Sequence, residues 1–278
     1  SRGLGDVYKR QPYDSKNVLF FRITDKTENI HQDTDYFHIT LNVPKTDIFS
    51  CQKTIFATNI HKHTMAGIYI HIPFCKTRCI YCDFYSTTRS ELKQQYIRAL
   101  CTELKTRKGY LKEEPIETIY FGGGTPSQLA HEDFEQIFRT IKEVYGTEHA
   151  EEITLEANPD DLTEEYVSML RTLPFNRISM GIQTFDAPTL KLLNRRHNAA
   201  QAIAAIHCLR QAGFRNISID LIYGLPDETD QRWERDLQQA VGLDVEHISA
   251  YHLTYEKGTR IYEMLQSHRI SEVDEESS

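Results

Sequence analysis

The sequence predicts an α/β fold, a partial (β/α)6 TIM-like barrel. From Gly67 onward, short runs of β-branched and aromatic residues alternate with amphipathic stretches, which is the pattern of repeated βα units around a parallel sheet. Six such units occur without an evident closing pair, and this favours an open or partial barrel. A doubly wound sheet is the alternative that periodicity alone leaves open.

The predicted strands are short apolar runs at residues 67–72, 118–121, 152–156, 177–181, 218–222 and 247–251. Between the first two, residues 91–107 form a helix whose apolar face has a spacing of four, at Leu92, Tyr96, Leu100 and Leu104. Similar faces recur later, around Phe134, Val167, Ile203 and Trp233. Gly146 and Gly213 follow two of these stretches, where glycine commonly ends a helix.

Residues 1–64 differ from the rest of the chain. They are polar, and their apolar fragments, such as residues 18–21, establish no period. We expect a poorly ordered N-terminal extension, either an artefact of cloning or gene prediction or a natural arm, and a core domain over residues 65–278. The acidic residues 271–278 fall where a helix could begin, so we expect the chain to stop short of its natural terminus.

Composition narrows the function classes. The formal net charge is −8 and no long basic run occurs, which disfavours nucleic-acid binding. No stretch reaches the roughly 20 apolar residues of a membrane span, and residues 18–21 are too short for a signal-peptide core. Three of the six cysteines share one loop, unlike a disulfide framework. We therefore expect a cytoplasmic protein that acts on small molecules.

The most informative motif is C-x3-C-x2-C, formed by Cys75, Cys79 and Cys82 directly after the first predicted strand. Clustered thiolates suit iron–sulfur clusters and zinc, and three of them leave one metal position without a cysteine ligand. We favour a [4Fe–4S] cluster whose free iron chelates the amine and carboxylate of S-adenosylmethionine, so that one electron releases a 5′-deoxyadenosyl radical. Two alternatives stay open: unligated core cysteines, and a zinc site completed by Asp83 or His71.

Other polar and flexible residues follow the predicted strands. Three consecutive glycines at residues 122–124 free the backbone to approach a ligand closely. Polar residues stand at the ends of the later strands, where barrel sites are built: Glu156, Asn158, Gln183, Asp220, Tyr251 and His252. Arg195 could reach a ligand carboxylate, or could be a solvated charge at a helix end. Together with the cysteines, these residues indicate one shared pocket.

Four motifs in order carry a family resemblance: residues 71–82 (His-Ile-Pro-Phe-Cys through the third cysteine), 122–127 (Gly-Gly-Gly-Thr-Pro-Ser), 177–183 and 220–226. They resemble the radical S-adenosylmethionine family of oxygen-independent coproporphyrinogen III oxidases and HemW haem chaperones, from about Met65 to the end. The resemblance implies a barrel of six βα units of the radical SAM type, with the cluster at its mouth. It also implies a C-terminal domain with a His-Asn-x-x-Tyr-Trp motif associated with haem binding, and we expect that domain to be missing here.

The resemblance also implies roles for individual residues. Cys75, Cys79 and Cys82 would ligate the cluster. The remaining implied residues would contact the bound S-adenosylmethionine, with Ile222 on the adenine side: Tyr69, Gly123, Gly124, Thr125, Glu156, Gln183, Arg195, Asp220 and Ile222.

The branch of the family is predicted from two stretches that resemble HemW, residues 82–84 and residues 248–254. The oxidases carry a further cysteine two residues after the third ligand, where this chain has Phe84, as HemW does. The leading hypothesis is a HemW-like chaperone that binds haem and delivers it to recipient haem proteins, with a reductant for the cluster. The alternatives are an oxidase that decarboxylates coproporphyrinogen III in porphyrin biosynthesis, so that oxidoreductase activity stays open, and a zinc-braced binding module. His197, His207 and His252 are candidate axial haem ligands, each with an ordinary structural role as its alternative.

Overall fold

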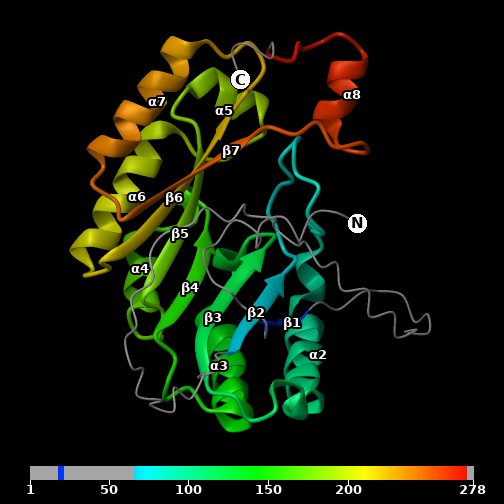
Figure 1. Cartoon of the computed structure of the whole chain (residues 1–278), viewed down its shortest axis with the longest axis vertical. Coiled ribbons are helices and arrows are strands. Elements are labelled where there is room, and N and C mark those ends of the chain that lie inside the picture. The colour runs from blue at the N-terminus through cyan, green and yellow to red at the C-terminus, as the bar shows by residue number, and fades with distance from the viewer. Residues whose placement is uncertain (1–17, 22–65, 274–278) are drawn as a thin grey trace, which may run out of the picture. The chain divides into compact units, whose positions relative to one another are not determined.

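Parallel strands in chain order make up the sheet of this protein (Figure 1). The computed structural model describes residues 18–21 and 66–273. The strands are β1 (Val18–Phe21), β2 (Ala66–Ile72), β3 (Ile116–Gly123), β4 (Glu152–Ala157), β5 (Arg177–Gln183), β6 (Asn216–Tyr223) and β7 (His247–His252). All six strands predicted from the sequence are confirmed, with each end within two residues of its predicted position.

Strand β1 was not among the predicted strands. It pairs in parallel with β2, Val18 opposite Gly67, and belongs to the same compact unit as the rest of the sheet. Four residues are too few to show a period, which is why the sequence pattern missed this strand. The rest of the expected N-terminal extension lies outside the described residues.

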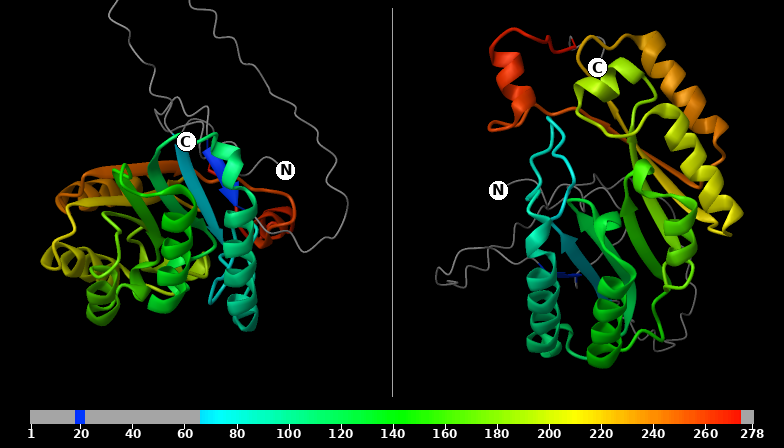
Figure 2. Two further views of the ribbon diagram at one scale, coloured as in Figure 1. Left: turned by 90° about the horizontal axis from the view of Figure 1, so that it is seen from below. Right: turned by 180° about the vertical axis from the view of Figure 1, so that it is seen from behind.

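The connecting helices lie on one face of the sheet (Figure 2). From β2 to β7 each strand pairs with the one before it, and parallel crossovers are right-handed, so the connections between these strands pass over the same side. This arrangement is that of an unclosed barrel rather than a doubly wound sheet. The helices are α2 (Lys93–Thr106), α3 (His131–Tyr145), α4 (Glu164–Leu170), α5 (Ala187–Leu192), α6 (Ala199–Gln211), α7 (Asp230–Gly242) and α8 (Arg260–Gln266). None of the helices in the described part of the chain has the length and apolar character that a membrane crossing requires.

The main core lies between the sheet and these helices. On β4, Ile153 and Leu155 point into this core, whereas the alternate residues Thr154 and Glu156 point to the opposite face, as the two-residue period of a strand requires. Four phenylalanine rings pack together in the core with centroids 5.1–5.7 Å apart, at Phe121, Phe134, Phe138 and Phe175. The face away from the helices is therefore the polar one.

A smaller group of buried side chains, which we call the second cluster, packs separately from the main core. It contains Ile80, Leu193, Ile222, Leu225, Leu253, Ile261 and Ile270. Its members come from the segment that carries the cysteines, from the ends of α5, β6 and β7, and from α8. The second cluster thus joins the C-terminal part of the described chain to the cysteine motif.

Candidate functional site

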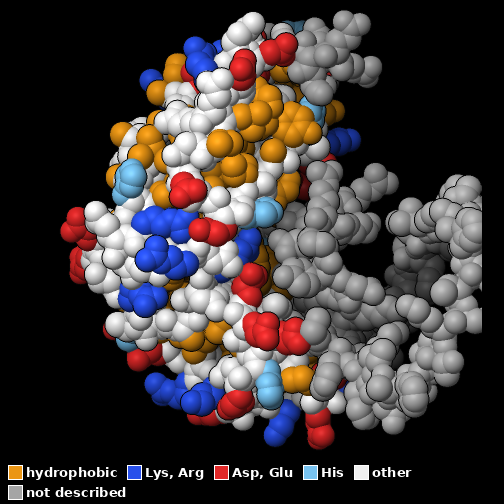
Figure 3. Space-filling model, turned by 60° about the vertical axis from the view of Figure 1, so that its left-hand side comes forward, with side chains coloured by type: hydrophobic (Ala, Val, Ile, Leu, Met, Phe, Trp, Pro, Cys, Tyr) orange, Lys and Arg blue, Asp and Glu red, His pale blue; other side chains and the backbone are white. Residues whose placement is uncertain are grey.

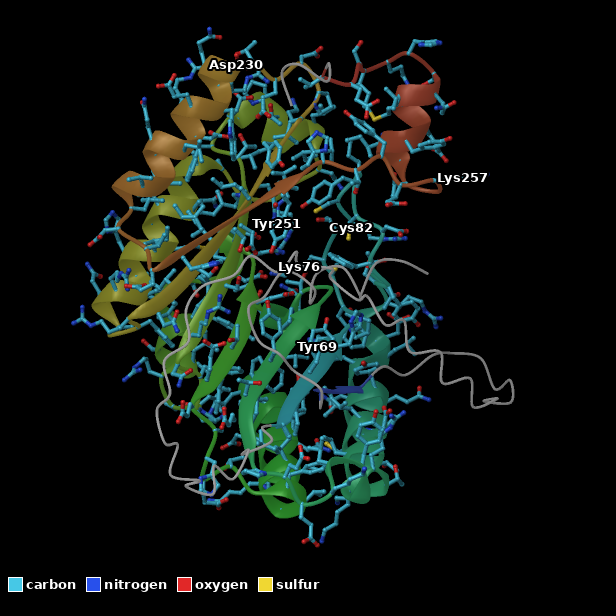
Figure 4. The ribbon with its side chains drawn as sticks, viewed as in Figure 1. Tyr69, Lys76, Cys82, Asp230, Tyr251 and Lys257 are labelled. Carbon is cyan, nitrogen blue, oxygen red and sulfur yellow. The ribbon has the colours of Figure 1, made fainter. Side chains whose placement is uncertain are left out.

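The three cysteines lie on residues 73–89, the cysteine loop, which follows β2. Figure 4 shows Lys76 and Cys82 on this loop, beyond the strand that carries Tyr69. Backbone hydrogen bonds close the base of the loop: Cys75 N donates to Thr87 O at 2.9 Å, and Thr87 N donates to Pro73 O at 2.7 Å. Short loops closed in this way hold their side chains in a narrow region.

The far end of the cysteine loop is fixed as well. Ile80 N donates to Leu193 O at 3.2 Å, and Ile80 O accepts from Ile261 N at 2.9 Å. The Ile80 side chain is buried in the second cluster. The segment between the second and third cysteines is therefore held, at Ile80, against the end of α5 and against α8 by backbone and apolar contacts.

Two of the cysteine sulfurs already accept hydrogen bonds from the protein. Thr125 Oγ1 donates to Cys75 Sγ at 3.4 Å, and Arg195 Nη1 donates to Cys79 Sγ at 3.4 Å. All three thiols are free and partly buried. Burial raises the pKa of Cys75, and it raises the pKa of Cys82 to about 11, with the charges of the other two cysteines adding to the latter.

The donor set fits a cluster better than it fits a single ion. Among residues 18–21 and 66–273, no three His, Cys, Asp or Glu side chains converge on a point that could hold one metal ion. In a [4Fe–4S] cluster each thiolate binds a different iron, so the sulfurs need only surround a larger volume. Hydrogen bonds to two of the sulfurs supply the stabilisation that cluster thiolates usually receive from their surroundings.

The glycines after β3 allow two close approaches. A side chain on Gly124 would lie 2.8 Å from the Pro73 backbone, and Gly124 N donates to Ile72 O at 2.8 Å. Gly123 has a φ of +111°, and a side chain there would lie 2.5 Å from the His71 ring. The glycines are therefore needed so that this segment can pack against the cysteine loop, in addition to any approach to a ligand.

Predicted site residues meet around Gly122. An added Cβ there would lie within 3.0 Å of Tyr69, Tyr120 and Glu156. The Tyr69 and Tyr120 rings stack with centroids 5.9 Å apart. Glu156 accepts from Tyr120 Oη at 2.7 Å and from Gly123 N at 3.0 Å, which orients its carboxylate toward the glycine segment.

Two carboxyl groups on the polar face of the sheet have raised pKa values. Burial, together with the charge of the nearby Asp220, raises the pKa of Glu156 to about 7. Burial likewise raises the pKa of Asp220 to about 6, although Ser179 Oγ donates to it at 3.4 Å. A cation bound beside these two carboxyl groups would favour their ionised forms and lower both pKa values.

Gln183, the last residue of β5, and Arg195 both lie beside Gly181. Arg195 Nη2 donates to Asn158 Oδ1 at 2.8 Å and to Gly181 O, while its buried Nε has no partner among the described residues. Gln183 has a φ of +74° at a bulge, and its amide folds against Gly181. A non-glycine residue at positive φ is strained, which is typical of residues held in place for a function.

The remaining predicted positions are more dispersed. Ile222 is buried in the second cluster. Among the candidate axial ligands, His197 is buried and donates through Nε2 to Ile182 O at 3.1 Å, and burial lowers its pKa to about 3. His207 is exposed on α6, and the His252 ring packs 5.1 Å from Tyr223. The described contacts do not bring these histidines together.

Sequence reasoning missed Asp161, whose carboxylate is almost fully buried. It accepts from Lys76 Nζ at 3.0 Å, from Ser127 Oγ at 2.8 Å, from Gln128 Nε2 at 2.6 Å and from Arg196 Nη2 at 3.1 Å. Its side chain is only 3% exposed, and these donors offset the cost of burying its charge. The signal available in the sequence was an Asp-Asp pair at residues 160 and 161, shortly after β4 and two residues beyond the Asn158 that was identified.

Comparison with known proteins identifies the family. The model of the radical SAM superfamily matches residues 69–240. The heme chaperone HemW of Bacillus subtilis is 36% identical over 208 residues, 74% of this chain and 55% of that protein. HemW of Lactococcus lactis is 39% identical over 69% of this chain and 50% of its own length. The chain therefore spans about half the length of the curated relatives it matches.

A solved structure has the same architecture. The coproporphyrinogen III oxidase HemN from Escherichia coli, described as a radical SAM enzyme, matches with a TM-score of 0.67 and 27% sequence identity. The match covers 77% of this chain and 49% of the HemN chain. The expected resemblance to the HemW and HemN branch is thus confirmed.

The contact at Gly124 gives a first prediction. In Gly124→Ala the new methyl group meets backbone atoms of residues 72 and 73, which cannot move without opening the base of the cysteine loop. We expect the free energy of unfolding to fall by about 1–3 kcal/mol, measured by urea denaturation. The control is Gly109→Ala, where no atom lies within 4 Å of the new group and the change should stay within about 0.5 kcal/mol. Equal effects of the two substitutions would contradict the packing argument.

The raised pKa of Glu156 gives a second prediction. Because its pKa is about 7 in the folded protein against 4.5 ordinarily, folding stability falls as the pH rises through this range. Glu156→Gln removes that loss, so from pH 5 to pH 8 the variant should gain up to about 3 kcal/mol relative to the wild type. Urea denaturation at both pH values measures this, with Glu143→Gln on the exposed side of α3 as the control. A difference that does not depend on pH would refute the assignment.

Proposed function

Because the chain belongs to the radical SAM superfamily, we propose that Cys75, Cys79 and Cys82 bind a [4Fe–4S] cluster and leave its fourth iron free for S-adenosylmethionine. When bound, these groups supply one-electron chemistry that no side chain provides. The observation that carries the proposal is the pair of hydrogen bonds to Cys75 and Cys79. Donors placed on two thiols of one loop are what a negatively charged cluster needs.

The S-adenosylmethionine site is proposed on the residues beyond and beside the cysteine loop. Glu156 and Asp220 would face its positive charges, and the free Nε of Arg195 supports a contact to its carboxylate. The other proposed contacts are Tyr69, Gly123, Gly124, Thr125 and Gln183, with Ile222 on the adenine side. The convergence of Tyr69, Tyr120 and Glu156 around Gly122 supports this location.

We propose a HemW-like role for the chain: binding haem for delivery to recipient haem proteins. Support comes from the relatives named heme chaperone HemW, and from Phe84, which replaces the further cysteine expected of the oxidases. Phe84 is 39% exposed beside Cys82, so the loop presents an aromatic surface there instead of a thiol. The haem site itself is not assigned to residues of this chain.

A second candidate is anaerobic oxidative decarboxylation of coproporphyrinogen III. The likeness to the E. coli HemN structure favours it, because the two chains share their fold over 77% of this chain at 27% sequence identity. Phe84 argues against it. The two candidates predict different ligands for the same cluster and S-adenosylmethionine site, so they can be separated by experiment.

The cellular setting is proposed on the same grounds. Reduced cysteines on the cluster loop fit the cytoplasm, and the cluster requires an electron donor. Nucleic acid is not expected as a partner, because the net charge is −8 and the face in Figure 3 carries acidic side chains among its basic ones.

Cluster assembly tests the proposal directly. We expect anaerobic reconstitution of the 278-residue chain to give about four irons and four sulfides per protein, with an electron paramagnetic resonance signal that changes when S-adenosylmethionine is added. Replacing Cys75, Cys79 or Cys82 by alanine should abolish both the bound iron and sulfide and the paramagnetic signal. Cys101→Ala and Cys208→Ala, on α2 and α6, are matched controls that should retain it. Bound zinc without sulfide would refute the proposal.

Haem and coproporphyrinogen III separate the two candidate functions. For the chaperone role we expect the Soret band to shift when haem is titrated into the reconstituted protein. We also expect no decarboxylated porphyrinogen when coproporphyrinogen III, S-adenosylmethionine and dithionite are supplied. The Phe84→Cys variant tests the branch position in the same assays. Turnover of coproporphyrinogen III without a haem-dependent change would establish the oxidase instead.

A further inference from the structure

The two donors that reach the cysteine sulfurs meet at one side chain. Thr125 donates to Cys75, and Arg195 donates to Cys79. Asn158 contacts both donors: its Nδ2 donates to Thr125 Oγ1 at 3.4 Å, and its Oδ1 accepts from Arg195 Nη2 at 2.8 Å. One amide therefore bridges the surroundings of the first and second cysteines.

The hydrogen-bond directions are mutually consistent. The guanidinium of Arg195 can only donate, so the oxygen of the Asn158 amide must face it. The amide nitrogen then faces Thr125 and donates to its hydroxyl oxygen, which leaves the hydroxyl hydrogen free for Cys75 Sγ. Reversing the amide would place two donors against each other at Arg195.

Asn158 is itself held by a buried charged anchor. Its backbone N donates to Ser127 Oγ at 3.2 Å, and Ser127 donates to Asp161 Oδ2 at 2.8 Å. Asp161 N in turn donates to Asn158 O at 3.1 Å, which closes the turn between them. Because Asp161 also accepts from Lys76 of the cysteine loop, the turn is fixed relative to that loop.

We propose that Asn158 is a positioning residue that sets the reduction potential of the cluster by holding Thr125 and Arg195 against two of its thiolates. The inference rests on the proposed function. A cluster gains one negative charge when it is reduced, and hydrogen bonds to its sulfurs stabilise that charge and raise the potential. Asn158 touches neither the sulfurs nor the iron, so it acts through its two neighbours.

The test is a redox titration of the reconstituted 278-residue protein without S-adenosylmethionine, followed by electron paramagnetic resonance with dithionite as the reductant. We expect Thr125→Val to shift the potential to a lower value because one donor is lost. Asn158→Ala should shift it further, because both donors are released. Thr125→Ser keeps the hydroxyl and should restore the wild-type potential.

A double variant separates positioning from general structural damage. Because Asn158 acts through Thr125, adding Thr125→Val to Asn158→Ala should change the potential less than adding Thr125→Val to the wild type does.

A replacement variant and a control complete the test. If Asn158→Ala assembles no cluster, Asn158→Asp is used in its place. It keeps the acceptor for Arg195 but draws the Thr125 hydroxyl hydrogen to its own carboxylate, so the potential should again fall. Arg89→Met, which removes an exposed ion pair with Glu91 near the end of the loop, is the control and should leave the potential unchanged.

Several results would overturn the inference. The inference is wrong if the potential of Asn158→Ala, or of its replacement Asn158→Asp, equals that of the wild type. It is also wrong if Thr125→Ser and Thr125→Val have equal potentials. A third contrary result is a double variant in which Thr125→Val lowers the potential of Asn158→Ala by as much as it lowers that of the wild type, because the two residues would then act independently. A wild-type protein that assembles no cluster would overturn the proposed function as well, whereas a wild type with a cluster and an unaffected Asn158 variant would overturn this inference alone.

Discussion

Hydrogen bonding between successive parallel strands, in chain order, is the constraint on which the site depends. Since every strand from β2 to β7 runs the same way beside its predecessor, all of their carboxyl ends reach one edge of the sheet. The cysteine loop, the glycine segment, the Asn158 turn and Arg195 all belong to connections leaving that edge. This strand order places the segments after β2, β3, β4 and β5 next to one another, so that their side chains come within hydrogen-bond distance.

The cysteine loop gains its order from three kinds of contact. Backbone pairing closes its base, the second cluster buries Ile80 at its far end, and Asp161 binds Lys76 between them. The Lys76 ammonium is largely exposed and would contribute little on its own, but it shares a buried carboxylate with Arg196, Ser127 and Gln128. A loop held in this way can present its thiols before any metal binds, which lowers the ordering cost of assembly.

The sequence predicted the parts of this protein that have local signals. Strand runs have a recognisable composition, and three cysteines in a short motif are rarely accidental. Asn158 and Asp161 are polar residues shortly after a strand, but their contacts with other segments had no such signal, because those partners lie between 31 and 85 residues away along the chain. Nor could any period predict the positive φ of Gln183, which arises where a bulge shifts the register between β5 and β6. Contacts between two connecting segments can be predicted only when the strand order of the sheet is known, because that order decides which segments are neighbours.

The electrostatics of the polar face follow from what the site is proposed to hold. Glu156 and Asp220 are held where burial opposes their charged forms, which costs folding stability at neutral pH. An isolated barrel would be more stable with neutral residues at these positions. A ligand with a sulfonium and an ammonium group reverses this balance, because each positive charge favours the ionised carboxylate beside it. Under the proposed function, the cost of burying these two carboxyl groups would be offset when the cation binds, and the affinity would then depend on charge as well as on shape.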